Sequence, residues 1–345
     1  MMFDIQVLHS ITEIDAVKWD RFNRSCPFAS HQWYRFGEAA QPEDQPFYIL
    51  LSKQGELVAR AVFWLVRQEP LPIAWMPARR GLQAVFRRWP LLICRTALAH
   101  APGLLLPRDE SRQEALATFA RVADDIAREH GASAILFDYL SAGASVSSNW
   151  PEGYALMDLG EPGTRLMLDA PDFDAYVSGL GKSARKDYHR HTNRAADLGI
   201  TIAYHDSAVQ AEAALALIRD VEQHHHASPY PNARHLLKHM GMVGGTWITA
   251  TIGERLVGCG LLVGDGSTQF LTLLGLDYSV NFTYFQLFYA AIRRAIELGV
   301  SDLRGGSGAY DFKKRLGFEI EPNDQIALKA TNPVLSRVAR CFAGA

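Results

Sequence analysis

The chain has 345 residues, of which 48% are hydrophobic and 21% are charged. This composition excludes a disordered chain, and the length predicts two domains of ordinary size, each with its own core. The formal net charge of −2 gives no global attraction to nucleic acid, so we expect no DNA partner, and RNA binding would need a local basic patch.

Cysteine usage predicts a reducing compartment, so we expect a cytoplasmic protein with small buried thiols. The four cysteines are scattered, without the spacing of a metal site: Cys26, Cys94, Cys259 and Cys341. The N-terminus alternates like a strand and carries Asp4, which is not typical of a signal peptide. The most apolar stretch, 89–107, contains Arg95, His100 and three prolines, so we expect no membrane span, which needs about 20 apolar residues in a row.

The first half of the chain reads as an α/β unit. We expect a strand at 3–8, a helix N-capped by Thr12 that runs towards Asn23, a helix at 31–40, a hairpin at 46–66, a helix at 114–130 and a strand at 134–139. The segment 69–112 lacks clear periodicity and is rich in proline, arginine and tryptophan, which is typical of a functional segment.

The second half starts with a loop at 141–148 and a strand at 165–169. A helix begins at Asp172, is interrupted near Gly179–Gly181 and continues to Leu198. We then expect strands at 200–205, 245–251, 256–263, 268–275 and 302–304, helices at 208–225 and 284–298, and a strand at 325–329 that closes the second sheet.

The two halves repeat one order of landmarks. A hairpin with a Gly-Glu turn occurs at Gly55-Glu56 and again at Gly253-Glu254. Each hairpin follows a helical pair broken by proline and an aromatic residue, and precedes a long helix ended by glycine, Gly131 or Gly299. A repeat of this length predicts a duplicated domain, and we expect domains at 1–165 and 166–345.

This element order resembles the GNAT acyltransferase fold, and two copies in tandem resemble the Fem-type peptidyltransferases and the related CelD/BioF-like group. Two segments carry the resemblance: FDAYVSGLGKSARKDYHRHTNRAADLGI at 173–200 and GGSGAYDFKKRLGF at 305–318. The expected fold is α/β, with two tandem GNAT-like domains of mixed, mostly antiparallel sheets. No sustained heptad is present, so the chain is similar to members without a coiled-coil arm.

The resemblance implies transfer of an acyl or aminoacyl group to a small-molecule or peptidyl amine, with the donor on the second domain and the acceptor on the first. The amine would attack directly, because no Cys or Ser has the setting of a nucleophile. The loop 277–283 lacks the glycines that hold CoA, which favours aminoacyl-tRNA over acyl-CoA as donor. We expect no tightly bound cofactor; a non-catalytic binding protein remains an alternative.

The second motif provides the candidate donor site. By resemblance, Phe312 and Lys313 lie near the donor's phosphates, and the ammonium of Lys313 could act on phosphate or oxyanion. The alternative is a solvated basic run, Lys313 to Arg315. The turn residues Gly305, Gly306, Ser307 and Gly308 could present backbone N–H groups to an anion, or form a turn that needs glycine for its dihedral angles alone.

A basic helix face is the second candidate for phosphate binding. Lys182, Arg185 and Lys186 share that face with His189 and Asn193, and a solvated face is the alternative.

Three consecutive histidines, His224 to His226, occur at the end of an expected helix. Their side chains point in different directions, which excludes one shared metal ion. His226 could be the base for the amine, or simply cap the helix end.

The candidate acceptor residues come from both halves of the chain. An arginine fork suits a carboxylate or phosphate of the acceptor, and the alternative is surface arginines around a core tryptophan. Tyr310 could position the substrate or give a proton to the leaving group. The acceptor candidates are Trp75, Arg79, Arg80, Arg108, Tyr284 and Tyr310.

Overall fold

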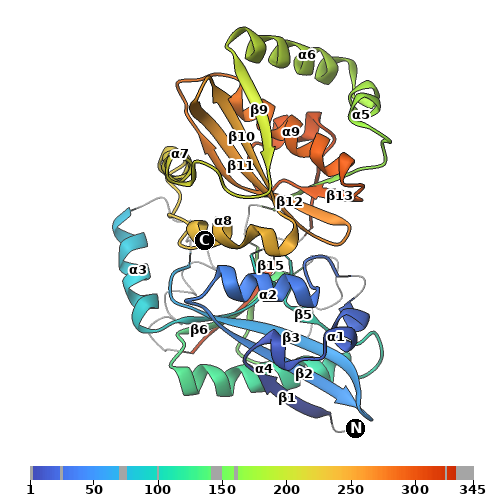
Figure 1. Ribbon diagram of the computed structural model, residues 1–345. Helices are drawn as coiled ribbons and strands as arrows, with labels where there is room; N and C mark the ends of the chain where they lie inside the picture. Colours follow the sequence, from blue (N-terminus) through green and yellow to red (C-terminus); the bar gives the residue numbers. More distant parts are fainter. Residues whose placement is uncertain are drawn as a thin grey trace. The chain divides into compact units, whose positions relative to one another are not determined.

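The computed structural model describes residues 3–23, 26–69, 76–98, 101–140, 150–158, 162–322 and 325–331, with side chains omitted at 76–80. These residues form two compact units. The first unit contains the described residues up to Pro162 together with those from Pro322 onward, and the second contains Gly163–Glu321. Figure 1 shows both units.

The first unit is built on a sheet with the strand order β1-β2-β3-β4-β6-β15-β7, to which β5 adds by pairing with β3. Its strands are β1 (Asp4–Leu8), β2 (Gln45–Lys53), β3 (Glu56–Val66), β4 (Leu91–Cys94), β5 (Leu104–Leu105), β6 (Ala134–Leu140), β7 (Ala155–Asp158) and β15 (Gln325–Ala330). Neighbours are antiparallel except β4 and β6, which run parallel.

Helices cover both faces of this sheet. Its helices are α1 (Ala16–Asn23), α2 (His31–Ala40), α3 (Met76–Arg88) and α4 (Arg112–His130). On one face, the rings of Trp19 in α1 and Tyr34 in α2 pack against Tyr48 of β2. On the other face, Phe119 of α4 shares a buried apolar cluster with Ile49. Because successive strand residues point to opposite faces, the adjacent Tyr48 and Ile49 serve different helix layers.

The second unit repeats this plan with the order β9-β10-β11-β12-β13-β8-β14. Its strands are β8 (Thr164–Met167), β9 (Ile200–His205), β10 (Thr246–Ile252), β11 (Arg255–Asp265), β12 (Thr268–Leu276), β13 (Asp302–Arg304) and β14 (Glu319–Ile320). Its helices are α5 (Phe173–Gly179), α6 (Lys182–Asp197), α7 (Ala211–His224), α8 (Ala233–His239), α9 (Thr283–Glu297) and α10 (Tyr310–Arg315). Again one neighbouring pair is parallel, β12 with β13.

The helices of the second unit also form two layers. Leu287 and Ile292 of α9 lie in the main apolar cluster, with Tyr188 of α6 packed against it. Helix α7 lies close against β12: a Cβ at Gly275 would be 2.9 Å from the backbone nitrogen of Ile218. Only glycine allows that approach.

The two hairpins share their register and the length of their loops. Strands β2 and β3 join through a two-residue loop in 53–56, and β10 and β11 through one in 252–255. Each pair shifts register shortly before its turn, between Leu51 and Ser52 and between Ala250 and Thr251. A register shift at the same place in both ladders supports duplication of one unit.

The glycines of these hairpins are not equivalent. Gly55 is the second of the two loop residues and Gly253 is the first, and both have positive φ, 81° and 58°. Both positions belong to the mirror-image turns of short hairpins. The two loops correspond, but the Gly-Glu pairs within them are shifted by one residue relative to each other, in contrast to the expected alignment. The helix ends do correspond, because Gly131 and Gly299 both adopt left-handed conformations directly after α4 and after the end of α9.

The last strand of the chain joins the first sheet, which corrects the expectation for 325–329. β15 lies between β6 and β7, whereas the corresponding place in the second sheet, between β13 and β14, is taken by β8. A strand pattern specifies which face is buried but not which sheet supplies the partner. The expected boundary at 165/166 falls inside β8, and residues from Pro322 belong to the first unit.

Two other expectations need correction. The helix that runs to Asn23 begins at Ala16, and Thr12 does not cap it. Thr12 lies in a separate short turn, Ile11–Glu13, which Ser10 caps in a capping box with Glu13. The segment 69–112 is more regular than expected, because it contains α3 and the central strand β4. Helix α2, strand β9 and strand β13 are confirmed at their expected bounds.

Candidate active site

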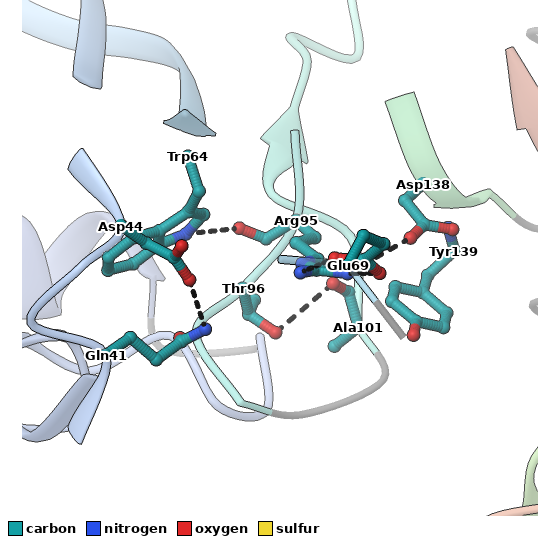
Figure 2. A network of polar contacts seen from close by, with 9 residues as sticks. All are labelled: Gln41, Asp44, Trp64, Glu69, Arg95, Thr96, Ala101, Asp138 and Tyr139. Carbon is teal, nitrogen blue, oxygen red and sulfur yellow. Dashed lines mark hydrogen bonds and ion pairs between the residues drawn. The ribbon is translucent and has the colours of Figure 1, made fainter. Parts of the chain in front are cut away.

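A polar cluster lies where the parallel strands of the first unit end. Arg95 directly follows β4, Asp138 lies near the end of β6, and Glu69 follows β3. Figure 2 shows these side chains together, with Asp44 and Gln41 on the other side of the Arg95 backbone. We call Gln41, Asp44, Glu69, Arg95 and Asp138 the Arg95 cluster. Ligands of α/β sheets bind outside the carboxyl ends of the parallel strands, so this is the position expected for a site.

Arg95 holds the cluster together. Its guanidinium donates two parallel hydrogen bonds to the Glu69 carboxylate, both 2.7 Å long, and Nη1 lies 3.9 Å from Asp138 Oδ2. The other oxygen of Asp138 accepts a hydrogen bond of 2.8 Å from the backbone N–H of Tyr139. The bidentate geometry fixes Glu69 on Arg95. Asp138 lies farther from the guanidinium, so it is less stabilised by the positive charge.

Backbone contacts fix the loop that carries Arg95. The Trp64 indole N–H donates to the carbonyl oxygen of Arg95 at 3.2 Å, and the Thr96 hydroxyl donates to that of Ala101 at 3.2 Å. At the end of β6, Tyr139 has a φ of 55°, an uncommon conformation for a residue with a side chain. Hydrogen bonds thus hold the segment after β4, and an uncommon backbone conformation marks the end of β6, both beside the cluster.

The cluster carries more acid than base. Burial raises the pKa of Asp138 to about 6, against a partial lowering by Arg95. Burial also raises the pKa of Asp44 to about 7. Both groups change protonation state close to neutral pH. A carboxylate with a pKa in this range is suited to accept a proton from a substrate.

In the second unit, the corresponding strand end is occupied by a lysine. Lys313 of α10 is 2% exposed, and its ammonium donates hydrogen bonds to the carbonyl oxygens of Gly305, Gly306 and Ser307 at 2.8, 3.1 and 2.9 Å. Burial lowers the pKa of Lys313 to about 8. The three donors of an ammonium are therefore all directed to the turn that follows β13.

The glycine-rich turn at 305–308 and the neighbouring Phe312 have structural roles. Gly306 and Gly308 have φ values of 66° and 77°, so glycine is needed there for the backbone itself. Phe312 packs its ring against Tyr284 and Phe288 of α9, at 5.4 and 5.7 Å between centroids. Phe312 and Tyr284 anchor α10 on α9. Contact of Lys313 or the turn with a donor remains a prediction.

The basic face of α6 divides into exposed and structural members. Lys182 and Lys186 are exposed, as are His189 and Asn193. Arg185 instead donates to the carbonyl oxygens of Ser178 and Leu180 at the end of α5, at 2.6 and 2.9 Å. Its side chain joins α5 to α6, so the exposed lysines are the members free to meet phosphate.

The other candidates are dispersed. His226 is exposed after the end of α7 with a φ of 53°, whereas the neighbouring His224 stacks on Tyr278 at 3.9 Å and His225 lies 3.2 Å from the hydroxyl of Tyr278. Burial lowers the pKa of His225. Arg108 is exposed and Tyr310 is half-buried at the start of α10. Trp75 and the side chains of Arg79 and Arg80 lie outside the described residues.

The loop before α9 differs from a phosphate-binding loop. Asp277 accepts hydrogen bonds from the backbone N–H and the hydroxyl of Ser279, at 2.9 and 2.6 Å, and also pairs with Arg255. These contacts lower the pKa of Asp277, and the hydrogen bond from the Ser279 hydroxyl has the largest effect. Helix α9 has no side-chain hydrogen bond at its N-terminus. An anion here would meet free helix N–H groups but also a nearby carboxylate.

The family model for FemAB-like proteins, described as peptidoglycan biosynthesis/recognition, matches residues 10–340. The chain belongs to this family. As a FemAB-like protein with tandem GNAT units, it is a transferase. A search of curated proteins found no match. Among the described residues, no helix is both long and apolar enough to cross a bilayer, and no group of three or more His, Cys, Asp or Glu side chains is arranged to hold a metal ion.

Solved structures share the fold over nearly the whole chain. FemX has a TM-score of 0.61 at 12% identity, covering 96% of this chain and 99% of that chain. A tandem GNAT protein from the clavulanic acid biosynthesis pathway has a TM-score of 0.56 at 13% identity, covering 96% and 99%. L-PGS from Bacillus licheniformis has a TM-score of 0.54 at 14% identity, covering 96% and 98%. At these identities the similarity shows the fold alone.

Sequence reasoning did not find the Arg95 cluster. Its members come from four separate segments, and only the pairing of β4 with β6 brings Arg95 and Asp138 to the same sheet end. One signal was available in the sequence. Arg95 directly follows the apolar run LLIC, and Asp138 directly follows the apolar run AILF. Recognising two parallel strands in these runs would have placed both side chains at one edge.

Proposed function

We propose that this FemAB-like protein forms an amide bond by transferring an acyl or aminoacyl group to an amine of a peptidyl acceptor. The observation that supports this most is the acidic Arg95 cluster at the end of the parallel strands of the first unit. A primary amine is mostly protonated at neutral pH and must lose a proton before it attacks a carbonyl carbon. A buried carboxylate with a pKa near 6, such as Asp138, is suited to take that proton.

Direct attack by the amine is the mechanism that fits the chain. The C–N bond forms as the ester C–O or thioester C–S bond breaks, and the leaving oxygen or sulfur takes a proton. A covalent intermediate on a cysteine would need a thiolate, and burial raises the pKa of the thiols of Cys94 and Cys259. These two cysteines are therefore inert packing residues.

The second unit is the proposed donor side, with aminoacyl-tRNA favoured as donor. The exposed Lys182 and Lys186 of α6 offer positive charge to a phosphate backbone. Asp277, close before α9, would repel the pyrophosphate of CoA at the place where a GNAT domain holds it. The uncapped N-terminus of α9 is the one observation that favours acyl-CoA instead.

The test uses the full chain and two donors. Purified protein is incubated with a peptidoglycan-precursor peptide that carries a free ε-amine, and with either a labelled aminoacyl-tRNA mixture or labelled acetyl-CoA. We expect label in a base-stable amide on the peptide, dependent on tRNA and abolished by prior ribonuclease treatment. Label from acetyl-CoA alone would establish the N-acyltransferase alternative. No amide product with either donor would reject the proposed function.

A further inference from the structure

Helix α6 is docked on the second unit by a narrow row of side chains. Ala184, His191 and Ala195 are its buried residues, and Tyr188 is half-buried between the first two. Their spacing of i, i+4, i+7 and i+11 places all four on one face of the helix. Because alanine buries little apolar surface, the docking of α6 depends mainly on the rings of Tyr188 and His191.

His191 makes the closest ring contact between α6 and α9. Among the histidines that the structure describes, it alone is buried, with 5% exposure. Its ring stacks on that of Phe285, with 3.9 Å between the centroids and 19° between the planes. Nδ1 lies 3.0 Å from the hydroxyl of Tyr289, one turn further along α9, and the ring of Tyr188 packs on the edge of Tyr289 at 4.9 Å. His191 therefore combines packing with a hydrogen bond to α9.

The neighbours of His191 define its protonation state in the docked helix. Nε2 lies 3.3 Å from Nη2 of Arg190. Because a guanidinium has donors and no acceptor, Nε2 accepts this hydrogen bond and carries no proton. The single ring proton is then on Nδ1 and is donated to the hydroxyl of Tyr289. The docked arrangement thus uses the neutral imidazole, and a proton on Nε2 would face another donor.

Charges around the ring also oppose its protonation. The ionisable groups near it come from α6, α9 and α10, and they are Asp187, Tyr188, Arg190, Tyr289 and Arg315. The one carboxylate among them, Asp187, is already shared between Arg190 at 2.8 Å and Arg315 at 3.0 Å. Burial lowers the pKa of His191, and Arg190 lowers it further, against the opposing charge of Asp187. A positive charge on His191 would add to two cations that share one anion.

We propose that His191 is a proton-sensitive latch, which holds α6 on α9 while the imidazole is neutral and lets α6 separate more readily once it is protonated. An unfolded or undocked histidine has a pKa of about 6.5. The docked ring binds a proton less readily, so the stability from the latch is complete above about pH 6.5 and is lost as the pH falls through the lower pKa of the docked state. The apolar cluster between α9 and the sheet does not include His191, so we expect local opening of α6 with the rest of the unit folded.

Hydrogen exchange of the α6 amides in the full chain tests the latch. After correction for the intrinsic pH dependence of exchange, we expect protection at 184–195 to fall by about threefold or more between about pH 7.5 and about pH 5. His191→Phe keeps an aromatic ring next to Phe285 but takes up no proton, so its α6 protection should be equal at the two pH values. His189→Phe replaces the exposed histidine two residues away, and this matched control should keep the wild-type response.

The imidazole NMR signals of His191 give a second measurement that needs no substitution at that position. In the wild-type chain they should titrate below the ordinary midpoint of about 6.5. Arg190→Gln should raise the midpoint, because it removes the cation beside Nε2. A wild-type midpoint at or above the ordinary value would overturn the latch. So would α6 protection that is equal at both pH values in wild type, or a pH response of α6 that persists in His191→Phe.

Discussion

The two units share a sheet plan but differ in chemistry where their parallel strands end. In the first unit, Glu69 and Asp138 lie against the Arg95 guanidinium, and burial raises the pKa values of Asp138 and of Asp44 towards neutrality. In the second unit, Lys313 directs its three donors into the turn after β13, and Arg304 pairs with Glu321 at 3.2 Å. The first strand end thus carries carboxylates that titrate near neutral pH, whereas at the second the ammonium of Lys313 is used within the protein.

This difference shows where duplicated units diverge. Features that build the unit are kept in both copies: the hairpin with its register shift, the left-handed glycine after the long helix, and the single parallel strand pair. The side chains at the strand ends differ between the two units. We interpret the first unit as the one that acts on the acceptor and the second as the one that binds the donor.

The largest expected effect comes from removing β15. Truncation after Pro322 takes away the strand between β6 and β7, with its buried Ile326 and Ala327. Because the missing strand belongs to the first sheet, we expect the first unit to unfold while the second unit stays folded. Hydrogen exchange measures this by comparing the hairpins at 45–66 and 246–263. Truncation after Thr331, which keeps β15, is the control, and protection of both hairpins in the shorter chain would contradict the strand assignment.

The next effect is on the second unit. Lys313→Ala removes three hydrogen bonds made by a buried ammonium, although the Gly306 oxygen keeps the Thr164 hydroxyl as a donor, so we expect a loss of unfolding free energy on the order of 3 kcal/mol. Lys314→Ala is the matched control because Lys314 is exposed. Chemical denaturation gives both values. If Lys313→Ala keeps wild-type stability but transfer slows by about 10²–10³, the lysine acts on the donor instead.

Replacing Asp44 should raise the free energy of unfolding, whereas replacing Lys313 should lower it. Its pKa is raised from 3.8 to about 7 in the folded protein, so its contribution to stability is present below about pH 4 and is lost as the pH rises through about 7. Asp44→Asn removes this loss. We expect the variant to gain on the order of 2 kcal/mol over wild type at about pH 8 and little at about pH 4. A constant difference between the two proteins across this range would show that Asp44 is not strained by burial.

The smallest effect concerns the exposed lysines of α6. The double variant Lys182→Ser, Lys186→Ser should keep its stability but bind tRNA more weakly, with a salt slope reduced by about one to two counterions. Fluorescence titration of tRNA at several salt concentrations measures the slope. Arg185→Ser should instead lower stability, because Arg185 joins α5 to α6. An unchanged slope in the double variant would remove α6 from the donor site.

Sequence reasoning reached the fold because its signals are local. Periodicity and glycine stops define α9 and both hairpins, and the duplicated order defines the architecture. Strand β4 was missed because its four residues follow a proline and are too short to show a period. The partner of β15 and the convergence of Arg95 with Asp138 depend on contacts between distant segments, which no local pattern encodes.

The most direct test of the account is the pH dependence of single-turnover transfer. If Asp138 takes the proton of the acceptor amine, the wild-type rate should rise as the pH passes through about 6 and then level off. Asp138→Asn should be slower by about 10²–10³ near neutral pH and should keep rising with pH, because it depends on amine that is already neutral. Asp138→Asn with the wild-type rate and the wild-type plateau would contradict the assignment of the first unit as the acceptor site.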